Sequence, residues 1–451
     1  MKVNAINPAT EETIGEWEVS ENSAVKGAVK KAQSAFETWS RTDISERIGI
    51  LGKASVELKK DKSELSTLIT KEMGKPISES EGEVEATLGD MAWFLENGKK
   101  SLEDEMVDLG GSRGRIAFEP LGVVGAISPW NFPLNNPFYK IMPALISGDT
   151  VVWKPSELTS LVGIRIYEIF NRIGLPEGVL NIVLGGEETG KALVASKVDL
   201  VSLTGSTATG RDVMRRASKG LKKVVLELGG NDSFIVLNDA DLDTTVKRAV
   251  RGRFYNCGQV CSADKLFYVE EGIYDEFVRG FKEITETLKV GDPLDRSTDI
   301  GPLVSREQRD TLESQVNDSV EIGAKVLVGG KRSGSRGYFY QPTILTGVTK
   351  RMRALREETF GPVASVISVK NAKQAVKMTN ESPYGLAASV WTKDENKARD
   401  IAKLLNVGTV WINKSGEFRA EMPWGGIKDS GMGREFSRYG FLELVNIKSI
   451  L

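Results

Sequence analysis

Short apolar runs alternate with helix-like segments through most of this chain. Before the Gly229-Gly230 pair, the runs cover residues 121–128, 150–153, 179–184 and 198–203, and helical periodicity covers 161–173 and 187–195. After the pair, the runs cover 233–237, 265–269 and 408–412, and helical periodicity covers 241–256 and 273–288. Strands that alternate with helices build parallel, doubly wound sheets, which bind ligands at the carboxyl ends of their strands. The sequence therefore predicts an α/β fold with two such units and a cleft between them.

The length and charge of the chain limit its partners. A chain of 451 residues is long enough for two or three structural units. Its 60 basic and 62 acidic side chains give a net charge of -2, which provides no electrostatic basis for binding nucleic acid or an anionic membrane. The N-terminus lacks the apolar core of a signal peptide, and no window approaches the roughly 18 apolar residues of a membrane span. We therefore expect a cytoplasmic protein whose partner is a small molecule.

The cysteines and the absence of histidine limit the available chemistry. Cys257 and Cys261 cannot build a disulfide framework, and a zinc site without histidine would need mostly carboxylates, so we expect no bound metal. A cysteine nucleophile usually owes its thiolate to an imidazole, so its base here must be a carboxylate, a lysine or water. Glu227, which follows an apolar run, is the candidate base for Cys261. The competing interpretations are apolar packing for Cys261 and a buried ion pair for Glu227.

Two strand ends carry residues suited to a dinucleotide. Thr204-Gly205-Ser206 links the run at 198–203 to a helix, and glycine there lets the backbone approach a diphosphate, although it could also only tighten the turn. Lys154-Pro155-Ser156-Glu157 ends the run at 150–153 and places a cation and a carboxylate where ribose hydroxyls could bind. A surface ion pair is the alternative for that segment.

A glycine-rich segment at the end of another run raises the alternative of a different class of protein. Residues 185–192 nearly match the phosphate loop of nucleotide triphosphatases, and they also follow a strand. Ala192 replaces the hydroxyl that would hold Mg²⁺, and Glu187 and Glu188 would repel the phosphates. An ordinary turn explains this segment better.

The turn Pro129-Trp130-Asn131-Phe132-Pro133 is bracketed by two prolines, which stiffen it enough to fix the direction of the Asn131 amide. Apolar packing would explain the tryptophan and the phenylalanine. It gives no reason for an asparagine between them.

Taken together, these segments resemble the aldehyde dehydrogenase superfamily over almost the whole chain. The matching motifs, in family order, are 129–133, Lys154 to Glu157, Thr204 to Ser206, Glu227 to Gly230, Gly258 to Cys261, 357–362 and 423–426. The resemblance implies three parts: a dinucleotide-binding domain (1–102 and 121–229), a catalytic domain (230–432) and a β oligomerisation element (103–120 and 433–451). It also implies a homodimer or homotetramer, consistent with the alternating run 115–118, which suits an exposed arm.

The resemblance assigns three catalytic roles. Cys261 attacks the aldehyde carbonyl, and the Asn131 side chain and the Cys261 backbone N–H stabilise the resulting oxyanion. Hydride transfer to the nicotinamide then leaves a thioester. Glu227 activates the water that hydrolyses this thioester.

The family likeness also implies a cofactor site for NAD or NADP. Its expected residues are Trp130, Lys154, Ser156, Glu157, Gly205, Ser206, Gly229, Glu358 and Phe360. Lys154 and Glu157 are expected at the adenosine ribose, Ser206 at the diphosphate, and Glu358 with Phe360 at the nicotinamide. Glu157 would repel a 2'-phosphate, whereas Lys154 could pair with one if that carboxylate moves aside, so we favour NAD slightly over NADP.

The C-terminal segments 433–440 and 445–448 resemble the short succinate-semialdehyde dehydrogenase branch. The two arginines that many members of that branch use for the distal carboxylate are replaced here by Tyr139 and Tyr255. Arg419 could supply the missing cation, or it could pair with Glu421 at the surface. Phe418 and Ser262 complete the expected substrate residues. Glyceraldehyde, lactaldehyde and glyceraldehyde 3-phosphate are the alternative substrates.

Overall fold

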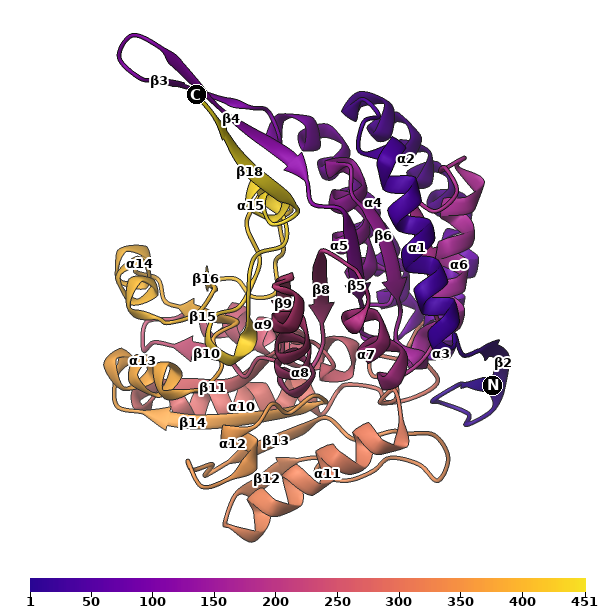
Figure 1. The fold of residues 1–451 in the computed structure, drawn as a ribbon. Coiled ribbons are helices and arrows are strands. Elements are labelled where there is room, and N and C mark those ends of the chain that lie inside the picture. Colours follow the sequence, from indigo (N-terminus) through magenta and orange to yellow (C-terminus); the bar gives the residue numbers. More distant parts are fainter.

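The computed structural model describes residues 1–451 and contains two large sheets (Figure 1). The first sheet has the strand order β17-β9-β8-β5-β6-β7, and only β17 runs antiparallel to its neighbour. Its strands are β5 (Val123–Ile127), β6 (Thr150–Lys154), β7 (Leu180–Ile182), β8 (Leu200–Thr204), β9 (Lys223–Glu227) and β17 (Gly431–Met432). The predicted parallel sheet is therefore confirmed, and the runs at 121–128, 150–153, 179–184 and 198–203 form four of its six strands.

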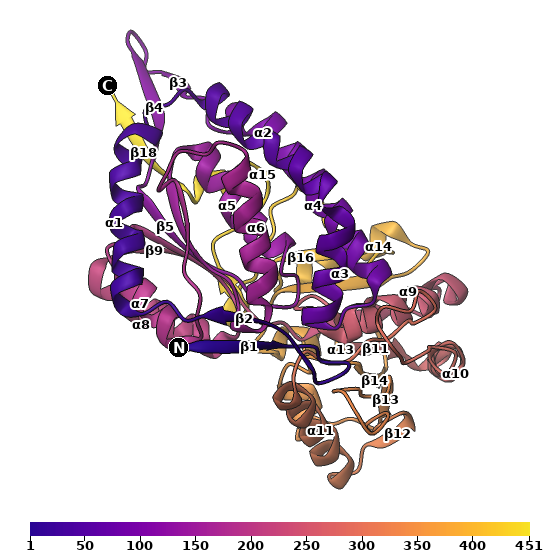
Figure 2. The same cartoon turned by 90° about the vertical axis from the view of Figure 1, so that its right-hand side faces the viewer.

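Helices cover both faces of this sheet because its central strands, β5 and β6, are buried on both sides. Val152 of β6 packs with Val25 and Val29 of α1 on one face, whereas Val151 packs with Ile141 and other residues of α5 and α6 on the other. Figure 2 shows α1 and α5 on opposite sides of the strands. The helices of this unit are α1 (Asn22–Trp39), α2 (Ile44–Lys60), α3 (Lys62–Met73), α4 (Ile77–Ser101), α5 (Asn135–Ser147), α6 (Ser160–Arg172), α7 (Glu187–Ala195) and α8 (Thr207–Ala217).

The second sheet has the strand order β12-β13-β14-β11-β10-β15-β16, and only β12 is antiparallel. Its strands are β10 (Asp232–Val236), β11 (Asp264–Glu270), β12 (Lys325–Val328), β13 (Thr343–Thr346), β14 (Val363–Val369), β15 (Ala387–Trp391) and β16 (Thr409–Ile412). Its helices are α9 (Leu242–Phe254), α10 (Tyr274–Thr285), α11 (Arg306–Glu321), α12 (Arg353–Arg356), α13 (Ala372–Glu381) and α14 (Glu395–Leu404). One apolar cluster of 40 buried residues forms the core of this unit.

A small antiparallel sheet projects from the body of the molecule (Figure 1). It has the order β18-β4-β3 and joins β3 (Glu105–Asp108) and β4 (Arg113–Pro120) to the C-terminal β18 (Val445–Ile450). A helix, α15 (Ser437–Leu442), precedes β18, and an N-terminal hairpin of β1 (Lys2–Ile6) and β2 (Thr13–Glu18) completes the fold. None of the helices is both long enough and apolar enough to cross a membrane.

The strand order of the first sheet indicates where a ligand would bind. From β5 the chain adds β6 and β7 on one side, and then β8 and β9 on the other. In doubly wound sheets, ligands bind at such a reversal, outside the carboxyl ends of the strands. The segments that leave this point are the turn containing Trp130 and Asn131, after β5, and Gly205-Ser206, after β8.

Candidate active site

A cavity of about 670 Å³ contains the residues expected to carry the chemistry. Its walls include both Cys261 and Glu227, together with all five expected substrate residues: Tyr139, Tyr255, Ser262, Phe418 and Arg419. These residues come from both large units and from the segment after β16. The fold therefore brings together residues that are up to 280 positions apart in the sequence (Tyr139 to Arg419, 419 minus 139).

A sharply turned loop after α9 carries the cysteine. Asn256 and Cys257 both have φ of +53°, in the left-handed region, and Gly258 follows with φ of +69°. Such backbone costs free energy at residues other than glycine and persists where its surroundings fix it. Here the Asn256 side chain donates to the Asn131 carbonyl oxygen at 2.9 Å, which ties the loop to the turn after β5. Cys261 thus emerges on the cavity wall from a tightly held loop.

The two thiols differ in their surroundings. Cys261 is half-buried and lines the cavity, whereas Cys257 is buried in the core of the second unit. Burial raises the pKa of Cys261 to about 12 in this ligand-free protein, and the nearby Lys265 charge opposes that rise. Burial also raises the pKa of Cys257. Of the two, only Cys261 is placed to meet a substrate.

Glu227 ends β9 and has an unusual environment for a carboxyl group. It is buried, and neither of its oxygens has a hydrogen-bond partner within the protein. Burial raises its pKa well above the ordinary 4.5, and the negative charge of Glu435 adds to the effect. Lys140 and Arg434 pull the pKa in the opposite direction. A neutral, unpartnered carboxyl beside a thiol is suited to act as a base once it loses its proton.

Asn131 does not line this cavity. Its side-chain nitrogen donates to the carbonyl oxygen of Gln259 at 3.0 Å, so one amide N–H supports the cysteine loop. An amide nitrogen has two N–H donors. The expected oxyanion role therefore stays a prediction that depends on the second donor.

The residues expected to bind a dinucleotide lie at the carboxyl edge of the first sheet. Ser206 caps α8 by accepting from the Thr209 N–H at 3.1 Å, and a Cβ added at Gly205 would meet nothing nearer than 3.5 Å. The open backbone at Gly205 and the free N–H groups of the α8 start suit a diphosphate. At the end of β6, Lys154 lies 3.8 Å from Glu157, so the expected pair forms.

A second group of these residues lies beside the cysteine loop. The Glu358 carboxylate accepts from the Gly230 N–H at 3.1 Å, and a side chain at Gly229 would collide with it. Phe360 and Trp130 meet edge to face, with ring centroids 5.4 Å apart. The Ser156 hydroxyl caps a short 3-10 helix that begins at Glu157. Together, the open backbone at Gly205, the capped helix start and the Glu157 and Glu358 carboxylates fit a nicotinamide dinucleotide.

The segment at 185–192 has a different role from a phosphate loop. Its lysine, Lys191, lies within α7 and forms ion pairs of 2.7 Å with both Glu187 and Glu188. Its ammonium is therefore already neutralised by the two carboxylates that argued against the triphosphatase interpretation.

Sequence reasoning missed several charged residues at the site. Arg248 and Arg251, both on α9, line the cavity with exposed side chains. Lys140 forms a buried ion pair with Glu435 and donates to the Thr204 hydroxyl at 2.7 Å. Lys265 lies fully buried beneath the cysteine loop. In the sequence, the only sign of these residues is the i, i+3 spacing of Arg248 and Arg251. That spacing is also typical of a solvated helix face.

A cavity-lining thiol, a buried carboxyl and a doubly wound sheet with an accessible switch point define a cysteine-dependent enzyme that uses a dinucleotide. Residues 1–450 match the model of the aldehyde dehydrogenase family, and the chain belongs to this family. It is an oxidoreductase that acts on aldehydes, as the sequence predicted.

The most similar relatives and structures agree on the family but differ in substrate. Succinate-semialdehyde dehydrogenase [NADP(+)] of Deinococcus radiodurans is 39% identical over 446 residues, which cover 99% of this chain and 94% of the relative. Betaine aldehyde dehydrogenase of Bacillus subtilis is 38% identical over 458 residues, covering 99% and 93%. A crystal structure of betaine aldehyde dehydrogenase from Staphylococcus aureus in complex with NAD+ has a TM-score of 0.97 at 35% identity, covering 100% and 91%.

Proposed function

We propose that this enzyme oxidises a short aldehyde with a distal carboxylate, such as succinate semialdehyde, to the corresponding acid. The observation that carries the proposal is the presence of three exposed arginines on the cavity wall: Arg248, Arg251 and Arg419. Arg248 lies 4.0 Å from Glu417, whereas neither Arg251 nor Arg419 has a carboxylate within 4.0 Å, and the expected alternative pairing of Arg419 with Glu421 is absent. Arginine binds carboxylates through two parallel N–H donors, so unpaired arginines suit an anionic substrate.

In the proposed mechanism, the Cys261 thiolate attacks the aldehyde carbon and forms a thiohemiacetal. The Cys261 backbone N–H and the free amide N–H of Asn131 stabilise its oxyanion, and loss of one such donor typically costs about 10²-fold or more. When bound, the nicotinamide accepts the hydride from this carbon. Glu227 then takes a proton from water, whose hydroxide attacks the thioester and releases the acid, so that the Cys261 thiolate is restored and Glu227 passes its proton to solvent.

The expected cofactor is NAD or NADP, and we favour NAD slightly. Lys154 is buried and already donates to the carbonyl oxygens of Pro155 at 2.9 Å and Gly185 at 2.8 Å. Glu157 is half-exposed beside it and would repel a 2'-phosphate. The relatives named above include one that is specific by name for NADP(+) and one crystallised with NAD+, so the comparison of both cofactors belongs in the first assay.

The domain division expected from the sequence gives each part a role. Strands β5 to β9 of the first sheet belong to the dinucleotide-binding domain (1–102 and 121–229). The second sheet belongs to the catalytic domain (230–432), which also contributes β17 to the first sheet. The small β18-β4-β3 sheet belongs to the oligomerisation element (103–120 and 433–451) and joins the chains of a homodimer or homotetramer.

A substrate panel tests the proposal. Reduced cofactor is followed at 340 nm, the nicotinamide absorbance, with NAD and NADP separately. The aldehydes are succinate semialdehyde, neutral butanal, cationic betaine aldehyde, glyceraldehyde, lactaldehyde and glyceraldehyde 3-phosphate. We expect the highest kcat/KM for succinate semialdehyde with NAD. A preference for butanal or betaine aldehyde would contradict an anionic substrate, and full activity of Cys261→Ser would remove Cys261 from the mechanism.

A further inference from the structure

The start of β11 places a fully buried lysine beneath the cysteine loop. The Lys265 side chain has no exposed surface, and its ammonium donates to the carbonyl oxygens of Cys261 at 2.7 Å, Val260 at 3.1 Å and Ala263 at 3.3 Å. An ammonium has three N–H donors. Three carbonyls of the nucleophile loop can therefore satisfy all of them.

The charge of this ammonium is balanced by carboxylates rather than by solvent. Glu358 Oε1 lies 3.7 Å from the Lys265 nitrogen, and the buried Asp232 carboxyl also acts on it. One oxygen of Asp232 accepts from the Ala387 N–H at 3.1 Å, whereas the other has no partner. Burial lowers the pKa of Lys265, and both carboxylates oppose that shift. A buried ion pair is a costly way to stabilise a fold, since apolar side chains of similar volume often do so equally well.

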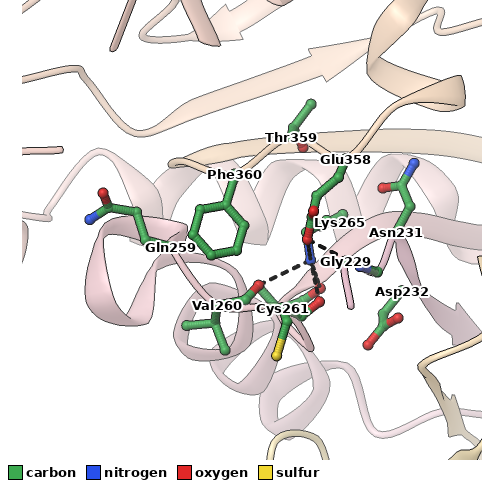
Figure 3. Close-up of polar contacts among 12 residues, drawn as sticks. Gly229, Asn231, Asp232, Gln259, Val260, Cys261, Lys265, Glu358, Thr359 and Phe360 are labelled. Atoms are coloured by element: carbon green, nitrogen blue, oxygen red, sulfur yellow. Dashed lines mark hydrogen bonds and ion pairs between the residues drawn. The ribbon is translucent and has the colours of Figure 1, made fainter. Parts of the chain in front are cut away.

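Lys265 acts on the backbone side of the loop. Figure 3 shows the ammonium between Glu358 and the loop carbonyls, with the Cys261 sulfur projecting in the other direction. Cys261 lines the cavity, but Lys265 does not. Lys265 therefore cannot touch a substrate in this cavity, and any effect on the reaction must pass through Cys261.

The position of Lys265 matters because of the charges that surround the Cys261 thiol. Glu358, Asp232 and Glu227 all disfavour the thiolate of Cys261, and Lys265 is the cation that opposes them. The other buried cation nearby, Arg253, donates to the Thr359 carbonyl oxygen at 3.0 Å and to that of Gly361, on the far loop. In a chain without histidine, no imidazolium is available to stabilise the thiolate.

We propose that Lys265 is the positioning residue of the nucleophile, which orients the 260–263 loop through its carbonyls and supplies the positive charge that stabilises the Cys261 thiolate. The proposal rests on the role of Cys261 given under the proposed function. It also explains why Glu358 lies where it does. A carboxylate that faces the nicotinamide site and contacts Lys265 links cofactor binding to the charge beneath the nucleophile.

The test is the pH dependence of Cys261 alkylation in the free enzyme. Iodoacetamide is added at a series of pH values, and the modified Cys261 peptide is quantified by mass spectrometry. In Lys265→Met, we expect the alkylation rate at a fixed pH to fall about tenfold, because loss of the cation raises the pKa of the Cys261 thiol. Lys265→Arg keeps a cation and should stay within about threefold of the wild type at the same pH. Circular dichroism confirms that each variant is folded.

A second variant covers the case in which Lys265→Met does not fold. Glu358→Gln removes a negative charge that disfavours the thiolate, so Cys261 should titrate at lower pH and alkylate several-fold faster at a fixed pH. A merely structural lysine would give equal losses in Lys265→Met and Lys265→Arg, and no acceleration in Glu358→Gln. An unchanged profile in Lys265→Met, or either of these results, would overturn the proposal.

The same samples separate this inference from the proposed function. If Cys261→Ser keeps full dehydrogenase activity, the proposed role of the cysteine fails, whatever the alkylation data show. If Cys261→Ser is inactive and Lys265→Met alkylates as the wild type does, only the inference about Lys265 fails.

Discussion

The Glu358 carboxylate occupies the space in which a side chain on Gly229 would lie. A Cβ at Gly229 would collide with Glu358 Oε2, and the neighbouring Gly230 N–H donates to Oε1 at 3.1 Å. The glycine pair thus lets the chain between β9 and β10 approach a carboxylate that we assign to the nicotinamide ribose. Residues without a side chain serve such close approaches between backbone and ligand sites.

Gly229→Ala should displace this carboxylate and weaken cofactor binding. We expect the Kd for NAD to rise about tenfold, the effect of losing about one charge-assisted hydrogen bond. Quenching of intrinsic fluorescence by NAD measures the affinity directly. Gly27→Ala is the matched control, because a Cβ at Gly27 meets nothing within 4 Å. An unchanged Kd in Gly229→Ala would separate Glu358 from the cofactor site.

Glu227→Gln should uncouple the two halves of the reaction. Hydride transfer needs the thiolate, whereas hydrolysis of the thioester needs a base, so the variant should give a burst of reduced cofactor followed by slow turnover. We expect the steady-state rate to fall by about 10²-fold or more. Stopped-flow absorbance at 340 nm resolves the burst. Unchanged steady-state turnover would exclude Glu227 as the base.

Glu435→Gln should move the pH dependence of the same step. The negative charge of Glu435 helps to raise the pKa of Glu227, so its removal should lower that pKa. The base form would then be present at lower pH, and the rising limb of kcat against pH should shift toward acid. Identical profiles in variant and wild type would mean that another group limits turnover.

The sequence predicted the elements well where their patterns are local. The helix at 187–195 was predicted with the bounds that α7 has, since its apolar positions and its flanking turns are all in the segment itself. The β1–β2 hairpin and the two-residue β17 were not predicted. Their strands are short and are defined by pairing, in β17 with the distant Leu226 and Glu227.

Residues of the candidate site could be predicted from the sequence only where the residue type itself indicates a chemical role. The family resemblance pointed to Cys261, Glu227 and the five expected substrate residues, and the structure shows that all seven line one cavity. By contrast, Lys265 lies in a strand between Asp264 and a run of apolar residues, and no local pattern shows that its ammonium turns back to the cysteine loop. The arginines on α9 face a cavity only because the segment at 415–419 packs opposite them, which is a property of the tertiary fold.

Arg419→Ala and Arg251→Ala should each reduce the selectivity for acidic aldehydes. We expect the KM for succinate semialdehyde to rise about tenfold in each variant, with little change for butanal, because a charge-assisted contact is worth about 1.5–3 kcal/mol. Lys414→Ala is the matched control, since Lys414 pairs with Glu417 at 3.1 Å and does not line the cavity. Equal effects on both aldehydes would assign the arginines to structure.

Asp264 should make the protein less stable as pH rises. Burial raises its pKa from 3.8 to about 7, although Ser415, Lys265 and Arg253 oppose the shift. The folded state therefore binds a proton that the unfolded state releases, so its stabilising contribution is present below about pH 3.8 and is lost as pH rises through about 7. Between pH 5.5 and 8, the Tm of Asp264→Asn should fall by about 1–2 °C less than that of the wild type. Parallel Tm curves in differential scanning fluorimetry would contradict this assignment.

Ile447→Asp should break the proposed assembly without unfolding the chain. β18 lies at one edge of the small sheet, and Ile447 is 61% exposed, as is Met106 of β3 at 61%. Exposed apolar strands with a free edge are suited to pair with another chain. We expect the wild type to elute in light scattering at two or four times the chain mass of 49.3 kDa, and Ile447→Asp to shift toward one chain mass. Asn446→Asp adds the same charge to the same strand in place of a polar residue and should keep the wild-type mass. A wild type that is already monomeric would contradict the role of this sheet.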